Sequence, residues 1–121
     1  MRLLAYCCFI LVLSCVKNPD AQTKIVSPEE MQTLLKMENI QLVDVRTEVE
    51  YKTGFIPNAI NIDFLSPTFM EQISKLDKDR PILVYCEKGG RSAKCSETLK
   101  AAGFKKIYDL EGGYSKWKFN K

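Results

Sequence analysis

Residues 81–92 read PILVYCEKGGRS and join an apolar strand to a cysteine-containing loop. The run 81–85 is the clearest strand in the chain, and it leads directly into Cys86. After the loop, the pattern predicts a helix from Ser92 to Ala102, with Gly103 as its C-terminal cap. A strand that passes through a short loop into a helix is the unit from which parallel α/β sheets are built.

Strands and helices also alternate on both sides of this unit. Ser27 can cap a helix that has Pro28 in its first turn, and Glu30 completes a capping box. A turn of helix over 48–52 is stopped by Gly54. The other expected elements are strands at 40–45, 59–62 and 106–110 and helices at 69–76 and 114–119. The alternation predicts an α/β domain with a mostly parallel sheet and helices on both faces.

Composition narrows the chemistry that this domain can perform. The 121 residues suggest one domain, and a net charge of +3 without a basic stripe argues against nucleic-acid binding. The absence of histidine excludes Ser-His-Asp and Cys-His pairs and every zinc site that needs imidazole. The five cysteines contain no C-x-x-C pair, which excludes thioredoxin-like and zinc-ribbon proteins. We expect no metal and no cofactor.

The loop after the central strand can activate a cysteine without histidine. Cys86 lies at the carboxyl end of a strand, before the amides that open the next helix. Gly89 and Gly90 allow the backbone to curl so that N–H groups converge, and Lys88 and Arg91 add positive charge. These features favour a thiolate, with a pKa below the usual value of about 8.5. The alternatives are a cysteine that only fills the core and a phosphate-binding loop.

Four motifs in order resemble the rhodanese superfamily, over about residues 24–119. They are LVDVR at 42–46, GFIPNAIN at 54–61, VYCEKGGRS at 84–92, and LEGGY at 110–114 with Trp117. The resemblance implies a three-layer α/β/α fold with a mostly parallel, five-stranded sheet. It also implies a sulfurtransferase that uses a persulfide on Cys86. The six-residue ring from Cys86 to Arg91 implies sulfur transfer, because the related phosphatases have a loop one residue longer.

The resemblance also assigns roles to individual residues. Cys86 is the expected nucleophile, and Asp44 and Arg46 are an expected supporting pair in which Arg46 bridges Glu50. The expected substrate-binding loop consists of Glu87, Lys88, Gly89, Gly90, Arg91 and Ser92. Arg91 would either hold an anionic donor or bond to loop carbonyls, and Ser92 is expected to cap the following helix. The expected partners are a small anionic sulfur donor such as thiosulfate and a thiol or protein-thiol acceptor.

Three positions depart from the family pattern. Phe55 replaces a common histidine and Asn58 a common glycine, while Glu87 is expected to weaken the attraction of the loop for anions. Cys95 is expected to fill the core. Two other functions stay open, a non-catalytic rhodanese-fold module that binds a protein and a redox carrier that uses Cys86 and Cys95.

The N-terminus has the layout of a secretory signal. Arg2 precedes an apolar run over 3–13, which is shorter than the roughly 20 residues of a membrane-spanning helix. The sequence VLSC at 12–15 resembles a bacterial lipobox, which implies cleavage before Cys15 and lipidation of that residue. Cleavage near Ala21 is the alternative. We expect a signal peptide at 1–14, a tether at 15–23 and a domain at 24–121. The protein would be exported to the periplasmic face of a bacterial membrane, held only by its lipid, or be soluble in the periplasm.

Overall fold

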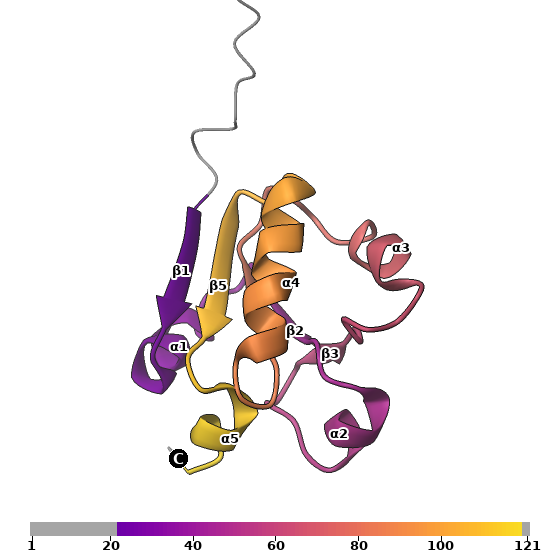
Figure 1. Ribbon diagram of the computed structural model, residues 1–121. Coiled ribbons are helices and arrows are strands. Elements are labelled where there is room, and N and C mark those ends of the chain that lie inside the picture. Colours follow the sequence, from indigo (N-terminus) through magenta and orange to yellow (C-terminus); the bar gives the residue numbers. More distant parts are fainter. Residues whose placement is uncertain (1–21, 120–121) are drawn as a thin grey trace, which may run out of the picture.

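The computed structural model describes residues 22–119, in which five strands alternate with five helices (Figure 1). The elements are β1 (Gln22–Val26), α1 (Pro28–Leu34), β2 (Gln41–Asp44), α2 (Glu48–Lys52), β3 (Ile60–Asn61), α3 (Phe69–Ile73), β4 (Ile82–Tyr85), α4 (Gly90–Ala101), β5 (Lys106–Leu110) and α5 (Gly113–Trp117). The predicted signal peptide, Cys15 and most of the tether lie outside the described residues.

The five strands form one sheet in the order β1-β5-β4-β2-β3, and all four neighbouring pairs are parallel. The predicted α/β fold with a mostly parallel sheet is therefore confirmed. Strand β1 was not predicted, and it begins at Gln22, two residues inside the expected tether. As an edge strand it buries only Val26, and Ile25 is 65% exposed, so its sequence lacks the alternating apolar pattern of a half-buried strand.

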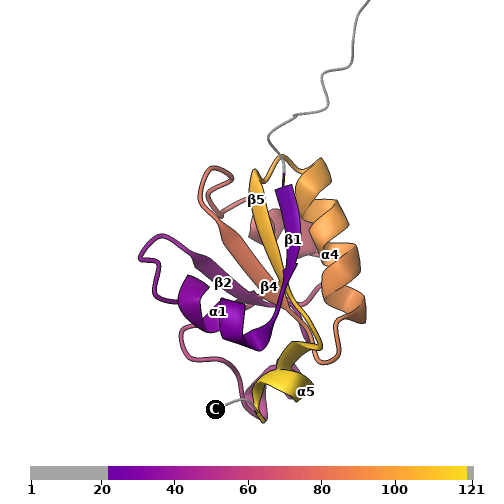
Figure 2. The ribbon, with the colours of Figure 1, turned by 90° about the vertical axis from the view of Figure 1, so that its left-hand side faces the viewer.

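Helices cover both faces of the sheet, as predicted. Figure 2 shows α1 and α4 on opposite sides of it. Strand β4 contributes to both cores, because Ile82 and Val84 face α3 and α4 while Leu83 and Tyr85 face α1 and α5. None of the helices within residues 22–119 is long and apolar enough to cross a membrane.

The helix starts show one correction. Ser27 caps α1 as predicted, since its Oγ accepts a hydrogen bond from the Glu30 amide at 3.1 Å. The Glu30 carboxylate, however, pairs with Lys24 at 3.1 Å. The reciprocal capping box instead opens α2, where Thr47 and Glu50 exchange side-chain and backbone bonds.

The strand order also locates the ligand-binding edge. The chain proceeds from β2 through α2 to β3 at one edge of the sheet, but from β4 through α4 to β5 toward the other edge. Strands β2 and β4 are neighbours in the sheet, and the loops that follow them lead toward opposite edges. Open α/β sheets bind ligands at the carboxyl ends of such a pair of strands. Asp44 is paired with Tyr85, so Arg46 and Cys86 follow at the same edge.

Candidate active site

A pocket of about 480 Å³ at this edge of the sheet is lined in part by Cys86. The residue directly follows β4 and is only 1% exposed, yet it lines the pocket. The other lining residues are Glu50, Glu87, Lys88, Gly90, Arg91 and Lys94. The structure thus brings most of the predicted loop residues together around one sulfur atom, and it adds Glu50 and Lys94, which were not predicted to belong to the site.

Backbone amides point at the sulfur of Cys86. The Gly89 N–H donates to Sγ at 3.0 Å and the Ser92 N–H at 3.4 Å. Gly89 has φ of 108°, a left-handed conformation that turns its amide inward and opens helix α4. Donors aimed at one sulfur atom stabilise negative charge on that atom.

Ser92 does not cap the helix, contrary to the prediction. The N-cap is Gly89, and Ser92 is a buried residue within α4. Its hydroxyl donates to the Gly89 carbonyl at 3.2 Å and lies 3.5 Å from the Cys86 sulfur. Ser92 therefore supports the sulfur from the core side, and it does not line the pocket.

Two carbonyl groups of the same loop accept hydrogen bonds from backbone amides of helix α5. The Tyr114 amide donates to the Cys86 carbonyl at 2.8 Å and the Ser115 amide to the Glu87 carbonyl at 3.0 Å. Gly113 has φ of 61°, and a Cβ added there would overlap the backbone of Cys86 and Glu87. This close approach explains why a glycine precedes Tyr114.

Asp44 and Arg46, the predicted supporting residues, form a buried ion pair behind the loop. Arg46 is 1% exposed, and its Nη2 lies 2.7 Å from Asp44 and 2.6 Å from the Gly54 carbonyl. Burial opposes its charge, but hydrogen bonds to Asp44 and Glu87 outweigh that effect and raise the pKa of Arg46. The guanidinium also lies 4.3 Å from the centre of the Tyr114 ring.

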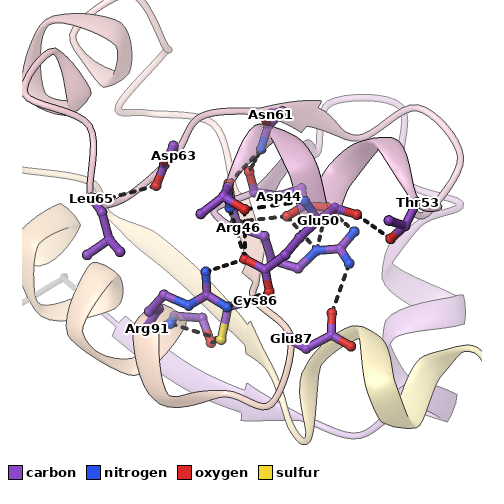
Figure 3. Close-up of polar contacts among 12 residues, drawn as sticks. Asp44, Arg46, Glu50, Thr53, Asn61, Asp63, Leu65, Cys86, Glu87 and Arg91 are labelled. Atoms are coloured by element: carbon purple, nitrogen blue, oxygen red, sulfur yellow. Dashed lines mark hydrogen bonds and ion pairs between the residues drawn. The ribbon is translucent and has the colours of Figure 1, made fainter.

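The second carboxylate bound by Arg46 is Glu87, where Glu50 was predicted. Nη1 of Arg46 contacts Glu87 at 2.9 Å (Figure 3). The Ser115 hydroxyl donates to the Glu87 carbonyl at 2.6 Å and lies 3.3 Å from the other carboxylate oxygen. Arg46 thus binds Glu87 from behind the loop, but it shares its single positive charge between Glu87 and Asp44. Glu87 was expected to weaken anion binding, and Arg46 offsets part of that effect.

Arg91 binds a carboxylate and not the loop carbonyls, and its role toward an anionic donor stays a prediction. Its Nη1 and Nη2 bind the two oxygens of Glu50 at 2.6 and 2.8 Å (Figure 3). The hydrogen bond from Arg91 is the main reason why the pKa of Glu50 falls to about 2. In the sequence, Glu50 lies three residues after Thr47, a spacing that indicates a helix start and gives no link to Arg91.

The remaining predicted positions lie around this centre. Cys95 is fully buried in the core beneath α4, as expected, and burial is the main cause that raises its pKa to about 12. Phe55 stacks on Tyr51 with ring centres 4.1 Å apart. Asn58 has φ of 71°, a conformation that favours glycine and that asparagine also tolerates. Within residues 22–119, no cluster of three acidic, cysteine or histidine side chains is placed to hold a metal.

Residues 27–120 match the rhodanese-like domain. The chain belongs to the rhodanese family. A rhodanese relative, the thiosulfate sulfurtransferase GlpE of Coxiella burnetii, is 36% identical over 95 residues, which cover 78% of this chain and 87% of GlpE. The tRNA uridine(34) hydroxylase of Buchnera aphidicola is 34% identical over 83% of this chain, but the match covers only 33% of the hydroxylase. Among solved structures, a rhodanese-related protein of Thermoplasma volcanium superimposes with a TM-score of 0.71 at 30% identity, covering 80% of this chain and 92% of that protein.

Proposed function

We propose that this rhodanese is a sulfurtransferase that carries sulfane sulfur as a persulfide on Cys86. The observation that supports this most directly is the pair of amides, from Gly89 and Ser92, aimed at the Cys86 sulfur. A ring of donors around one sulfur suits a reaction whose intermediate bears negative charge on sulfur. The similarity to GlpE, which is named as a thiosulfate sulfurtransferase, supports the same reaction class.

The first half-reaction loads the cysteine. The Cys86 thiolate attacks the outer sulfur of a donor such as thiosulfate, a new S–S bond forms, and the bond to the sulfonate sulfur breaks. The electron pair of the broken bond leaves with sulfite, so the total charge is unchanged. Because the leaving group is already an anion, this step needs no general acid, which agrees with a chain without histidine.

The second half-reaction unloads the cysteine. The thiolate of a small-molecule or protein acceptor attacks the terminal sulfur of the persulfide, and the electron pair of the S–S bond returns to Cys86. The loop amides stabilise the negative charge on the Cys86 sulfur as it leaves. Two separate half-reactions on one cysteine predict ping-pong kinetics.

The two other functions have less support. A non-catalytic binding module has no need for amides directed at a cysteine. A redox carrier would require Cys95 to attack an oxidised Cys86, but the Cys95 side chain is fully buried and its pKa is raised to about 12. A thiol with so high a pKa supplies little thiolate for disulfide exchange.

Mass spectrometry after thiosulfate treatment tests the proposal. Tryptic peptide 79–88 carries Cys86 and peptide 95–100 carries Cys95, so the two cysteines are read separately. One added sulfur is expected on peptide 79–88 alone. Replacing Cys86 with serine should abolish thiosulfate:cyanide transfer and leave thermal stability nearly unchanged, and residual transfer above about a tenth of wild type would contradict the proposal. Accumulation of a Cys86–Cys95 disulfide without added sulfur would favour the redox carrier.

We also propose that the domain works outside the cytoplasm, tethered through a lipid on Cys15. The proposal depends on the apolar run at 3–13 and the VLSC motif. Labelling with a radioactive fatty acid in a bacterial host should mark the wild-type chain and not the Cys15→Ser variant. Equal labelling of both would refute lipidation at Cys15.

A further inference from the structure

Three of the five charged side chains that line the pocket are bound to a group of opposite charge. The lining contains the carboxylates of Glu50 and Glu87 and the cations of Lys88, Arg91 and Lys94. Glu87 is bound from behind by Arg46, and Glu50 is bound by Arg91. An anion that enters the pocket therefore meets much less positive charge than the loop sequence indicates.

Arg91 is one of two cations in the loop, with Lys88, and both of its terminal nitrogens already bind a carboxylate. They bind the two oxygens of Glu50 at 2.6 and 2.8 Å, the bidentate geometry in which a guanidinium binds a carboxylate most strongly. The two side chains are 27% and 30% exposed, so solvent screens the pair only in part. A bound donor would compete with a carboxylate that is already in place.

Glu50 is held in this position from its own side. Its Oε1 accepts hydrogen bonds from the Thr47 amide at 3.2 Å and the Thr47 hydroxyl at 3.0 Å, and its amide donates back to that hydroxyl at 3.3 Å. The N-terminal turn of α2 thus fixes the carboxylate before any ligand arrives. Because its pKa is lowered to about 2, Glu50 keeps its negative charge at every pH at which the protein would work.

The other two cations of the pocket are weak substitutes for Arg91. Lys88 and Lys94 are exposed, and within residues 22–119 neither forms an ion pair with a carboxylate. Exposed ammonium groups on long side chains are strongly hydrated and screened by salt. They attract anions in general but do not fix one in a single orientation.

We infer that Glu50 is a specificity-determining residue, which cancels Arg91 and thereby favours a monoanionic sulfur donor, such as an organic thiosulfonate, over the thiosulfate dianion. This inference rests on the proposed function of Cys86. Both donors load the cysteine in the same way. With a thiosulfonate, the S–S bond to the sulfonyl sulfur breaks and its electron pair leaves with a sulfinate, where thiosulfate releases sulfite. The donors differ by one unit of negative charge, so cancelling the charge of Arg91 weakens the binding of the dianion more than that of the monoanion.

The test compares two donors on two variants of the full chain. Glu50→Gln removes the charge, while glutamine retains the side-chain oxygen that a capping box needs. Glu48→Gln is the matched control, because Glu48 lies in the same helix, pairs with Lys52 and does not line the pocket. Persulfide formation on peptide 79–88 is measured with thiosulfate and with benzenethiosulfonate.

Glu50→Gln should raise kcat/KM for thiosulfate relative to benzenethiosulfonate by roughly five- to tenfold, the effect of one uncancelled charge a few ångströms from the donor. Glu48→Gln should leave the ratio within about twofold, and added salt should reduce the gain in Glu50→Gln. An unchanged ratio, a ratio that shifts toward the thiosulfonate, or an equal shift in Glu48→Gln would overturn the inference.

Alkylation of Cys86 separates this inference from the proposed function. Iodoacetate is an anion and iodoacetamide is neutral. The rate of alkylation of Cys86 by iodoacetate divided by the rate with iodoacetamide, measured on peptide 79–88, therefore reports the charge around the sulfur without any sulfur transfer. The ratio should rise several-fold in Glu50→Gln and stay constant in Glu48→Gln. If no persulfide forms with either donor while this ratio rises, the proposed function fails and the role of Glu50 in cancelling Arg91 stands. If the alkylation ratio does not rise, the inference fails even where persulfide forms.

Discussion

Replacement of Arg46 by methionine tests how far the loop depends on one buried guanidinium. Arg46 joins three parts of the site, because it binds Asp44 after β2, the Gly54 carbonyl after α2, and Glu87 in the cysteine loop. Methionine fills a similar length of the core without the charge. The variant leaves Asp44 as a buried carboxylate whose main partner has gone.

The expected loss of stability in Arg46→Met depends on the contacts that Asp44 and Glu87 keep. Removing one partner of a buried ion pair costs about 3–5 kcal/mol. Asp44 still accepts the backbone amide of residue 46 at 2.9 Å, and the Glu87 side chain is 31% exposed and can turn to solvent. We therefore expect the lower part of the range, about 3 kcal/mol, which corresponds to a fall in Tm of about 12–24 °C for a domain of this size.

Urea unfolding followed by circular dichroism measures the loss. Arg80→Met is the matched control, because Arg80 makes an exposed bond to the Asn39 carbonyl and its replacement should cost no more than about 0.5–1 kcal/mol. In the double variant Asp44→Asn with Arg46→Met, part of the loss should be recovered, because no buried charge is left unpaired. A loss below about 1 kcal/mol in Arg46→Met would refute the reasoning that the pair organises the loop.

Two further predictions concern Gly113 and Asp109. Gly113→Ala should destabilise the protein by more than about 2 kcal/mol and slow persulfide formation, because the added Cβ would overlap the Cys86 carbonyl and Gly113 has a positive φ. Gly90→Ala is the control, because a Cβ at Gly90 meets no atom within 4 Å, and it should not destabilise the protein in the same unfolding assay. Equal stability of the two variants would contradict this account. Asp109 is 5% exposed, its Oδ1 has no hydrogen-bond partner within residues 22–119, and burial raises its pKa above the ordinary value of 3.8. The folded chain then binds this proton more tightly than the unfolded chain, so the contribution of Asp109 is favourable below the unfolded pKa and is lost as the pH rises through the folded pKa. Asp109→Asn should therefore be more stable than wild type by roughly 1 kcal/mol near pH 7 and lose that advantage toward about pH 4, and lower stability at both pH values would contradict it.

Much of the fold was predictable because its central elements have strong local patterns. Strand β5 begins and ends where the apolar run predicted, and β4 was placed within one residue. Helix α4 starts at Gly90, two residues before the predicted start, because its first turn is opened by a left-handed glycine and not by a capping side chain. Helix α3 ends at Ile73, although the apolar pattern continues to Leu76, since Leu76 packs on the core from the following turn.

The site was predictable only where it is local in the sequence. The loop 86–92 contains its own signal, a cysteine followed by two glycines and an arginine. The partners of its charges are not local, because Arg46–Glu87 and Glu50–Arg91 each join residues 41 positions apart. The pairing of Asp44 with Tyr85 between β2 and β4 brings these residues together. A sequence pattern does not specify which strands are neighbours, so the prediction joined Arg46 to Glu50 in place of Glu87 and gave Arg91 no carboxylate partner.

The depth of the Cys86 sulfur has a consequence for which molecules can react with it. The residue is 1% exposed, and an S–S bond is about 2 Å long, so a transferred sulfur would stand one atom nearer the rim. With so little of its surface exposed, the bare thiol is accessible to a reactant that enters the pocket. If Cys86 carries a persulfide as proposed, an acceptor would contact the outer sulfur more easily than a reactant contacts the bare thiol.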